Sequence, residues 1–259
     1  MIGQGRTAEI YAMEGKALKL FRADMEHKSV EKEYSIGKLI SGMGVPSPQV
    51  YDMVSIEGRQ GIVYQLVAGK TMLEHIFSRP FSLGRHARTL AHLHHGIHQH
   101  TVTGMPSQVR SLAEAISKTT ALSQHERKAI LLHLESLPQG EKLCHGDFHP
   151  DNVMVTPAKP IVLDWMNATV GNPAADVART IILLRDSAPP PGLPGWKTTM
   201  LSILRTLFSR AYIREYYRIS DLTPNLVEAW LLPVAAARLV EDLPTAEKQT
   251  LQRIVRQHL

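Results

Sequence analysis

The stretch CHGDFHPDNVMV, residues 144–155, followed by IVLDW, residues 161–165, decides the fold of this chain. Asp147 and Asn152 lie five residues apart in a loop rich in Gly and Pro, and Asp164 follows an apolar strand twelve residues after the Asn. Phosphoryl transfer needs a carboxylate beside the attacking hydroxyl and metal ions that neutralise phosphate charge. Asp147 can accept or orient the hydroxyl proton, while Asn152 and Asp164 supply the hard oxygen ligands that Mg²⁺ prefers. The spacing therefore indicates phosphoryl-transfer chemistry.

The same residues carry a family resemblance. HGDFHPDN followed by IVLDW resembles the signature of the aminoglycoside phosphotransferase and choline kinase-like family, which is similar to the protein kinases with their H-R-D-x-x-x-x-N and D-F-G motifs. The resemblance implies an α+β, bilobal protein-kinase-like fold with a small antiparallel β-sheet N-lobe and a larger, mostly helical C-lobe. It also implies ATP and Mg²⁺ as cofactors, Asp147 as catalytic base, and Asn152 and Asp164 as metal ligands.

A second element of the family follows this segment. Gly171, Asn172 and Pro173 before Asp176 resemble the G-x-P-x-x-D element, in which the Asp braces the catalytic loop. The resemblance therefore implies a structural role for Asp176. Trp165 stands where the protein-kinase motif has Phe, as is usual in the small-molecule branch of the family.

A rival interpretation of the motif is a transition-metal site. His145, Asp147 and His149 form H-x-D-x-H, which fits the ligand types of a metal-dependent hydrolase. The N-terminal features described next favour the kinase interpretation, in which His145 supports the loop.

The first residues read G-x-G-x-x-A before a strand, as expected of a loop that covers phosphates. Glycines let backbone N–H groups approach phosphate oxygens. We therefore expect Gly3, Gly5, Arg6 and Thr7 to contact the nucleotide, with Ala8 in place of the third glycine of the protein-kinase pattern.

A lysine on the third strand and a glutamate on the following helix are the next two requirements of a kinase. Lys19 in ALKLF fits the first and would contact the α- and β-phosphates. Glu33 shares its helical stripe with Ile36 and Ile40, whereas the stripe of Glu31 is more polar. We predict that Glu33 pairs with Lys19.

The predicted lobes divide near residue 67. Residues 1–67 form the β-rich nucleotide-binding lobe, and residues 68–259 form the helical lobe with the catalytic loop and the acceptor site. In a kinase-like fold, backbone groups of Leu66 and Val67 would bind the adenine edge.

Hydrophobic periodicity supports this layout. Strands are predicted at residues 8–13, 17–21, 50–55, 61–67, 153–155 and 161–163. Helices are predicted at residues 25–41, 71–77, 82–99, 108–135, 174–187, 197–218, 224–242 and 245–257. The Pro-rich segment 188–194 is predicted to be a surface loop.

Composition excludes several classes of protein. The 259 residues carry a formal charge of +5 without a long basic run, so we expect no nucleic-acid partner. No apolar stretch approaches the roughly 20 residues of a membrane span, so we expect no membrane partner. The single cysteine, Cys144, and an N-terminus without a signal-peptide pattern predict a soluble, cytoplasmic protein.

The histidine-rich segment AHLHHGIHQH is assigned no site. His94 and His98 have the i, i+4 spacing of a metal pair. No Glu or Asp completes a site nearby in the sequence, so we predict a surface or packing role for both.

The expected reaction is transfer of the γ-phosphoryl group of Mg-ATP to a hydroxyl of a small molecule, either a metabolite or an antibiotic. The interval from Asp164 to Gly171 is too short for the peptide platform of a protein kinase. A nucleotide-binding pseudokinase with a regulatory role and the metal-dependent hydrolase remain the alternatives. The sequence leaves the acceptor and the oligomeric state open.

Overall fold

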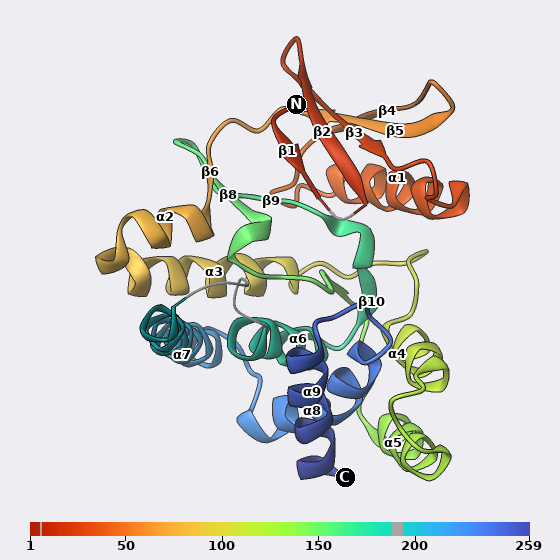
Figure 1. Ribbon diagram of the computed structural model, residues 1–259, viewed down its shortest axis with the longest axis vertical. Coiled ribbons are helices and arrows are strands. Elements are labelled where there is room, and N and C mark those ends of the chain that lie inside the picture. The colour runs from red at the N-terminus through yellow and green to blue at the C-terminus, as the bar shows by residue number, and fades with distance from the viewer. Residues whose placement is uncertain (6, 188–193) are drawn as a thin grey trace. The chain divides into compact units, whose positions relative to one another are not determined.

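A computed structural model describes residues 1–5, 7–187 and 194–259. The chain forms two compact units, drawn in Figure 1. Unit 1 contains residues 1–78 and 150–167, and unit 2 contains residues 79–149 and 168–259. The predicted lobe boundary at residue 67 stays a prediction.

Unit 1 is built on an antiparallel sheet of five strands in the order β1-β2-β3-β5-β4. These strands are β1 (Gly3–Gln4), β2 (Ala8–Met13), β3 (Lys16–Phe21), β4 (Val50–Ile56) and β5 (Arg59–Gln65). Two Glu-Gly turns close the β2–β3 and β4–β5 hairpins. Glu14 and Gly15 have φ of 42° and 80°, and Glu57 and Gly58 have φ of 50° and 78°. Two successive positive φ values match the right-handed twist of paired strands, and glycine supplies one of them without steric cost.

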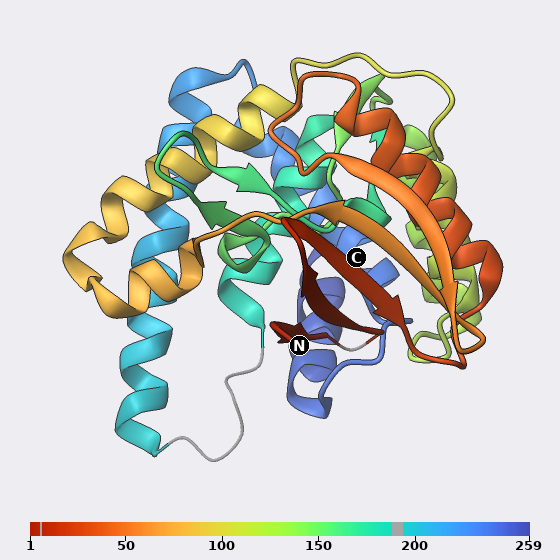
Figure 2. The same ribbon diagram turned by 90° about the horizontal axis from the view of Figure 1, so that it is seen from above.

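Helix α1 (His27–Ser41) runs along one face of this sheet, as Figures 1 and 2 show. Phe21, Val30, Val50 and Ile62 form the buried core between sheet and helix. Gly37 allows the close approach, because a Cβ there would lie 2.9 Å from a methyl group of Val50. The helical stripe that contains Glu33 is therefore the one that faces the sheet.

The remainder of unit 1 holds a three-stranded sheet in the order β6-β8-β9. Its elements are β6 (Lys70–Thr71), α2 (Met72–Ser78), the 3₁₀ turn η2 (Pro150–Asn152), β8 (Val153–Val155), β9 (Ile161–Val162) and the 3₁₀ turn η3 (Trp165–Asn167). The segment η3 packs against α1, and Val162 N–H donates to the carbonyl of Pro46 at 2.7 Å. These contacts bring the stretch after the catalytic loop onto the sheet-and-helix core.

Unit 2 is mainly helical. After the short turn η1 (Pro80–Ser82), its helices are α3 (Leu83–Ile97), α4 (Gln108–Lys118), α5 (Gln124–Ser136), α6 (Pro173–Asp186), α7 (Gly195–Ile219), α8 (Pro224–Arg238) and α9 (Thr245–His258). Among the described residues, every helix is too short or too polar to cross a bilayer.

Two secondary-structure predictions need correction. The helix predicted over 108–135 is wrong in its middle, because α5 starts anew at Ser123 with a capping box that Glu126 completes. The helical part also contains strands that periodicity missed, namely β6 and the antiparallel pair of β7 (Lys142–Cys144) with β10 (Thr169–Gly171). Each of these missed strands is only two or three residues long.

Candidate active site

The motif that decides the fold is shared between the two units. The chain passes from unit 2 to unit 1 after His149 and returns after Asn167. Asn152 and Asp164 therefore belong to unit 1, together with the glycine loop and Lys19, whereas Asp147 belongs to unit 2. Each group is described within its own unit.

Lys19 is the centre of the charged group in unit 1. It lies on β3, and its Nζ is 2.7 Å from Oε1 of Glu33 and 3.5 Å from Oδ1 of Asp164. Burial alone would lower the pKa of Lys19, but the carboxylates of Glu33 and Asp164 outweigh it and raise that pKa. The ammonium is therefore held charged, as binding of phosphate oxygens requires.

Glu33, rather than Glu31, is the partner of Lys19. The Tyr64 hydroxyl donates a second hydrogen bond to Glu33 Oε1 at 2.9 Å, and Oε2 is buried with no hydrogen-bond partner among the described residues. Burial, and then the nearby Glu33 charge, raise the pKa of Tyr64, so its hydroxyl stays a donor. Glu31 is half exposed and pairs with His27 at 3.3 Å. The contribution of the Lys19–Glu33 pair to nucleotide binding stays a prediction.

Asp164 has an unusual backbone conformation. Its φ of 58° lies in the left-handed region, which non-glycine residues rarely adopt and which is found at functional sites. Leu163 N–H donates to the Asn152 carbonyl at 2.8 Å, so the two predicted metal ligands lie on neighbouring segments. Their carboxylate and amide oxygens fit Mg²⁺, which needs only one or two protein ligands besides waters and phosphates.

The glycine loop and the predicted hinge also lie in unit 1. Gly3 pairs with Ile10 in the hairpin of β1 and β2. Gly5 N–H closes the turn of this hairpin by donating to the carbonyl of Ala8 at 2.8 Å. The Thr7 carbonyl accepts from Arg22 N–H. Arg6 lies outside the described residues.

The predicted hinge residues follow β5. Leu66 N–H donates to the carbonyl of Gly15, in the turn between β2 and β3, at 3.2 Å, so this donor is already engaged. Any adenine contact at Leu66 would therefore use its carbonyl. The binding role of Leu66 and Val67 stays a prediction.

In unit 2, Asp176 holds the backbone of the catalytic loop. Asn172 caps α6 by accepting from Ala174 N–H, which places Asp176 in the first helical turn. The Asp176 carboxylate then accepts His145 N–H at 2.5 Å on Oδ2 and Gly146 N–H at 2.9 Å on Oδ1. This is the bracing geometry that the family resemblance implies.

Asp147 lies directly after the braced residues. Its backbone N–H donates to His145 Nδ1 at 3.1 Å, and its carboxylate lies 3.5 Å from His149 Nε2 and 3.8 Å from an Arg179 nitrogen. Burial would raise the pKa of Asp147, but His149 and then Arg179 outweigh it and hold that pKa well below its usual range. Asp147 is therefore ionised at neutral pH, as a residue that orients a hydroxyl proton must be.

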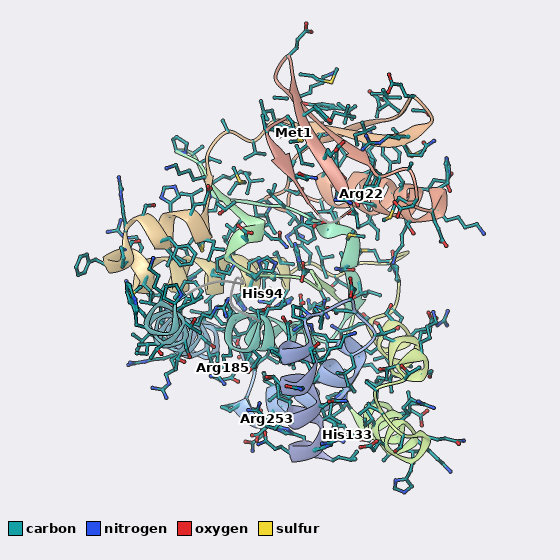
Figure 3. The ribbon with its side chains drawn as sticks, in the orientation of Figure 1. Met1, Arg22, His94, His133, Arg185 and Arg253 are labelled. Atoms are coloured by element: carbon teal, nitrogen blue, oxygen red, sulfur yellow. The ribbon has the colours of Figure 1, made fainter. Side chains whose placement is uncertain are left out.

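No acid near His94 and His98 in the sequence completes a set with them, but Asp176, which is distant in the sequence, lies beside both in space. Both Nε2 atoms face Asp176 Oδ2, at 3.1 Å for His94 and 3.2 Å for His98. Their Nδ1 atoms face the hydroxyls of Tyr212 at 2.7 Å and Tyr216 at 2.6 Å. All of these groups are buried, and Figure 3 shows His94 in the interior of the helical unit.

This cluster is a saturated hydrogen-bond network. An ionised carboxylate accepts about four hydrogen bonds, and Asp176 receives two from backbone and two from imidazoles. Burial and the neighbouring His98 lower the pKa of His94 to about 3, so His94 is neutral. The neutral His94 then donates from Nε2 to Asp176 and accepts the Tyr212 proton at Nδ1. The packing role predicted for both histidines agrees with this arrangement.

The rival H-x-D-x-H metal site lacks a suitable geometry. Within the described ranges, the one set of three His, Cys, Asp or Glu side chains close enough to share an ion is His94, His98 and Asp176. His145, Asp147 and His149 do not form such a set, and His145 Nδ1 accepts from the Asp147 backbone N–H.

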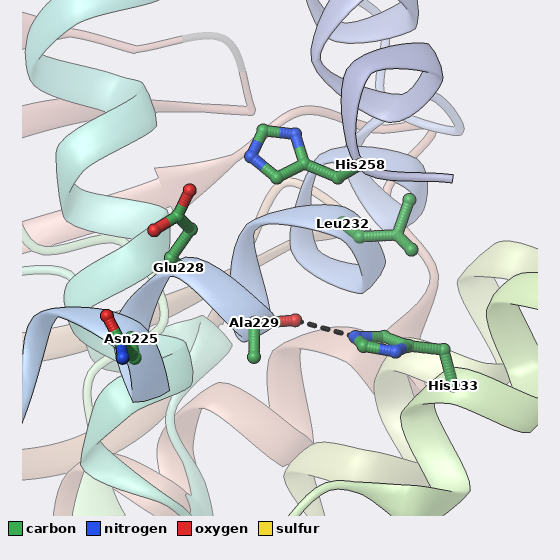
Figure 4. Close-up of a pocket in the computed structure, with 6 residues that line it drawn as sticks. All are labelled: His133, Asn225, Glu228, Ala229, Leu232 and His258. Atoms are coloured by element: carbon green, nitrogen blue, oxygen red, sulfur yellow. Dashed lines mark hydrogen bonds between the residues drawn. The ribbon is translucent and has the colours of Figure 1, made fainter.

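A hollow between α5, α8 and α9 is shown in Figure 4. Its volume of about 250 Å³ is below the roughly 300–1,000 Å³ of typical small-molecule sites. It is lined by His133, Asn225, Glu228, Ala229, Leu232 and His258. None of these is a predicted site residue, and His133 already bonds the Ala229 carbonyl at 2.8 Å.

Comparison with known proteins now decides the family. The phosphotransferase enzyme family matches residues 2–216. The chain belongs to this family. The match includes the glycine loop, Lys19, Glu33, Asp147 and Asp164, and it confirms the family resemblance.

Solved structures of small-molecule kinases have the same fold. A thermostable mutant of an aminoglycoside phosphotransferase, in a ternary complex with AMP-PNP and hygromycin B, aligns with a TM-score of 0.66 at 17% identity over 98% of this chain and 92% of that chain. A choline/ethanolamine kinase family protein from Mesorhizobium loti aligns with a TM-score of 0.60 at 15% identity over 98% and 85%. These likenesses confirm the predicted kinase-like α+β fold.

Curated relatives are much longer proteins. Acyl-CoA dehydrogenase family member 10 of Mus musculus is 27% identical over 78% of this chain, and member 11 of Gallus gallus is 29% identical over 59%. The chain covers only 21% and 22% of these two proteins.

Proposed function

We propose that this phosphotransferase-family chain transfers the γ-phosphoryl group of Mg-ATP to a hydroxyl group of a small molecule. The observation that carries the proposal is the pairing of Lys19 with both Glu33 and Asp164, because it keeps a cation and a metal-binding carboxylate side by side. Likenesses to kinases solved with AMP-PNP or ADP support ATP as the donor. We assign nucleotide binding to residues 1–67, and the catalytic loop and acceptor site to residues 68–259.

Each residue of the group has a defined task in this reaction. Lys19, held by Glu33, binds the α- and β-phosphates, and the backbone around Gly3 and Gly5 covers them. Asn152 and Asp164 would hold Mg²⁺, which neutralises phosphate charge when bound. Asp147 accepts a hydrogen bond from the acceptor hydroxyl and orients its oxygen for in-line attack on the γ-phosphorus.

A small alcohol is the acceptor that the chain fits best. Only η3 and β10 lie between Asp164 and Asn172, so no long segment is available there to hold a peptide. Structures of this fold include kinases bound to hygromycin B and to streptomycin, and choline kinases. The range of these acceptors limits the proposal to the class of small molecules with a hydroxyl group.

Thermal unfolding with ATP, with and without Mg²⁺, tests the proposal. A ligand that binds only the folded state raises its stability by about 2.7 kcal/mol at 100 times its dissociation constant. Wild type should show a Mg²⁺-dependent rise in Tm that Asp164→Ala loses. Asp151→Ala removes a neighbouring exposed carboxylate and should keep the rise.

The same experiment separates the alternatives. No rise with ATP or GTP at millimolar concentration would reject the kinase proposal. A rise without phosphate transfer to any acceptor or to water would favour the pseudokinase.

A further inference from the structure

A chain of alternating charges leads from helix α9 to Asp147, entirely within unit 2. Glu247 accepts from Arg238 at 2.8 Å, and Arg238 lies 3.3 Å from Oε2 of Glu241. Oε1 of Glu241 is 2.8 Å from Nη1 of Arg179, and Nη2 of Arg179 is 3.8 Å from Asp147. Glu241 therefore bridges two arginines, and one of them faces the proposed catalytic carboxylate.

Because these side chains are buried, each charge needs its partner for compensation. The side chains of Arg238 and Glu247 are only 3% and 6% exposed, and that of Arg179 is 18% exposed. Arginine stays protonated in proteins, so a buried guanidinium needs carboxylates to compensate its desolvation. Burial alone would lower the pKa of Arg179, and Glu241 and then Asp147 outweigh it and raise that pKa.

The two contacts of Arg179 differ in kind. Its contact with Glu241, at 2.8 Å, has the length of a charge-assisted hydrogen bond. Its distance of 3.8 Å to Asp147 is beyond hydrogen-bond length. The guanidinium therefore acts on the Asp147 carboxylate through its charge and not through a hydrogen bond. Arginine and carboxylate side chains in contact are frequently bidentate, and the hydrogen bond to Glu241 holds Arg179 back from that geometry. Such a pair would occupy the oxygens that the acceptor hydroxyl needs.

We propose that Glu241, fixed by Arg238, is a positioning residue that keeps Arg179 at charge distance from Asp147 and prevents the two from forming a closed ion pair. The inference rests on the proposed function, in which Asp147 receives the acceptor hydroxyl. Glu241 follows α8, and Arg238, Glu241 and Glu247 all lie beyond residue 216, where the family match ends. The C-terminal helices thus contribute to the reaction through Asp147, without supplying a residue to the motif.

The effect of each substitution on turnover is measured as the rate of ADP release from Mg-ATP. No acceptor is added, so water takes the place of the acceptor hydroxyl. Glu241→Gln keeps the side chain's shape but weakens its hold on Arg179, so kcat should fall about 100-fold while KM for ATP stays unchanged. Arg179→Met should lower kcat only about tenfold, because it removes the orienting charge but leaves no guanidinium that could close on Asp147.

The double variant distinguishes positioning from mere structural support. Glu241→Gln with Arg179→Met should be about tenfold faster than Glu241→Gln alone, because the competing guanidinium is gone. Glu215→Gln is the matched control, since Glu215 pairs with Arg218 at 2.7 Å in the same unit, and its kcat should equal that of wild type. A double variant no faster than Glu241→Gln, or an equal loss in Glu215→Gln, would overturn the inference.

A second measurement does not depend on the reaction. In protein labelled with ¹³C at the aspartate carboxyl carbons, the Asp147 signal is identified by its absence in Asp147→Asn. It should move in Glu241→Gln and stay in place in Glu215→Gln. A wild type that fails to bind ATP would end the proposed function, whereas an unmoved Asp147 signal in folded Glu241→Gln would end this inference alone.

Discussion

The two aspartates Asp164 and Asp176 show how differently the two units use a carboxylate. Asp164 in unit 1 is 39% exposed and lies 3.5 Å from Lys19, an arrangement that a metal ion or a phosphate can enter. Asp176 in unit 2 is 1% exposed and is saturated by four donors. Asp164 in unit 1 thus stays accessible to a ligand, whereas the buried charge of Asp176 in unit 2 holds the catalytic loop in one conformation.

Removing Asp147 should give the largest effect. General-base positioning contributes about 10²–10⁴-fold in rate, so Asp147→Ala should lower turnover by that factor, or about 3–5 kcal/mol of barrier. ADP release with Mg-ATP is the measurement, and Asp151→Ala on the same loop is the control that should keep its activity. An Asp147→Ala protein with undiminished turnover would contradict the assignment.

Breaking the saturated network should destabilise the fold strongly. Asp176→Asn loses the buried charge that four donors face, so the free energy of unfolding should fall by about 3–5 kcal/mol. Urea unfolding measures it. Asp186→Asn on the same helix is the control, because burial raises the pKa of Asp186 and its neutral replacement should cost little. A similar loss of unfolding free energy in Asp176→Asn and Asp186→Asn would show that the network does not stabilise the fold more than an ordinary carboxylate does.

The ion pair of Lys19 and Glu33 in unit 1 should contribute less to the free energy of unfolding than the network around Asp176. Glu33→Gln removes the charge that faces the Lys19 ammonium and weakens the bond from Tyr64, so the free energy of unfolding should fall by about 1–3 kcal/mol. Glu31→Gln, on the exposed side of α1, should stay within about 0.5 kcal/mol of wild type. Urea unfolding of the two variants decides between the two glutamates, and a larger loss for Glu31→Gln would reverse the assignment.

The pH dependence of stability should show the smallest effect. His94 has a pKa of about 3 in the fold, below its ordinary value of about 6.5. A depressed histidine pKa means that the unfolded chain binds more protons, so stability is complete above about pH 6.5 and is lost as the pH falls toward 3. One pH unit below 6.5 should cost up to about 1.4 kcal/mol.

Comparison with His94→Gln isolates this contribution. The depressed pKa of Asp176 acts only below about pH 4, where carboxylates titrate, so it does not interfere between pH 6.5 and 5. Urea unfolding across that range should give a shallower loss for His94→Gln than for wild type. Parallel losses in the two proteins would assign the pH dependence to other groups.

Much of the fold could be predicted because its signals are local. The Glu14-Gly15 and Glu57-Gly58 turns, the alternation in the strands and the stripe of α1 all depend on residues a few positions apart. The break between α4 and α5 also has a local cause in the Ser123 cap, but the helical period on both sides concealed it. The pairs formed by β6, β7 and β10 had no such signal, because strands this short are defined by their partners.

The order and spacing of the chemical groups can be read directly from the sequence: the glycine loop, Lys19, the Asp147–Asn152 loop and Asp164. Which charges meet depends on the packing of the folded chain. His94 and His98 reach Asp176 across 82 and 78 residues, and Arg179 on α6 reaches Glu241, which follows α8. The physical reason is that spacing along a chain limits contacts only within one helix or hairpin. Contacts between elements depend on how their buried faces pack, which no single motif encodes.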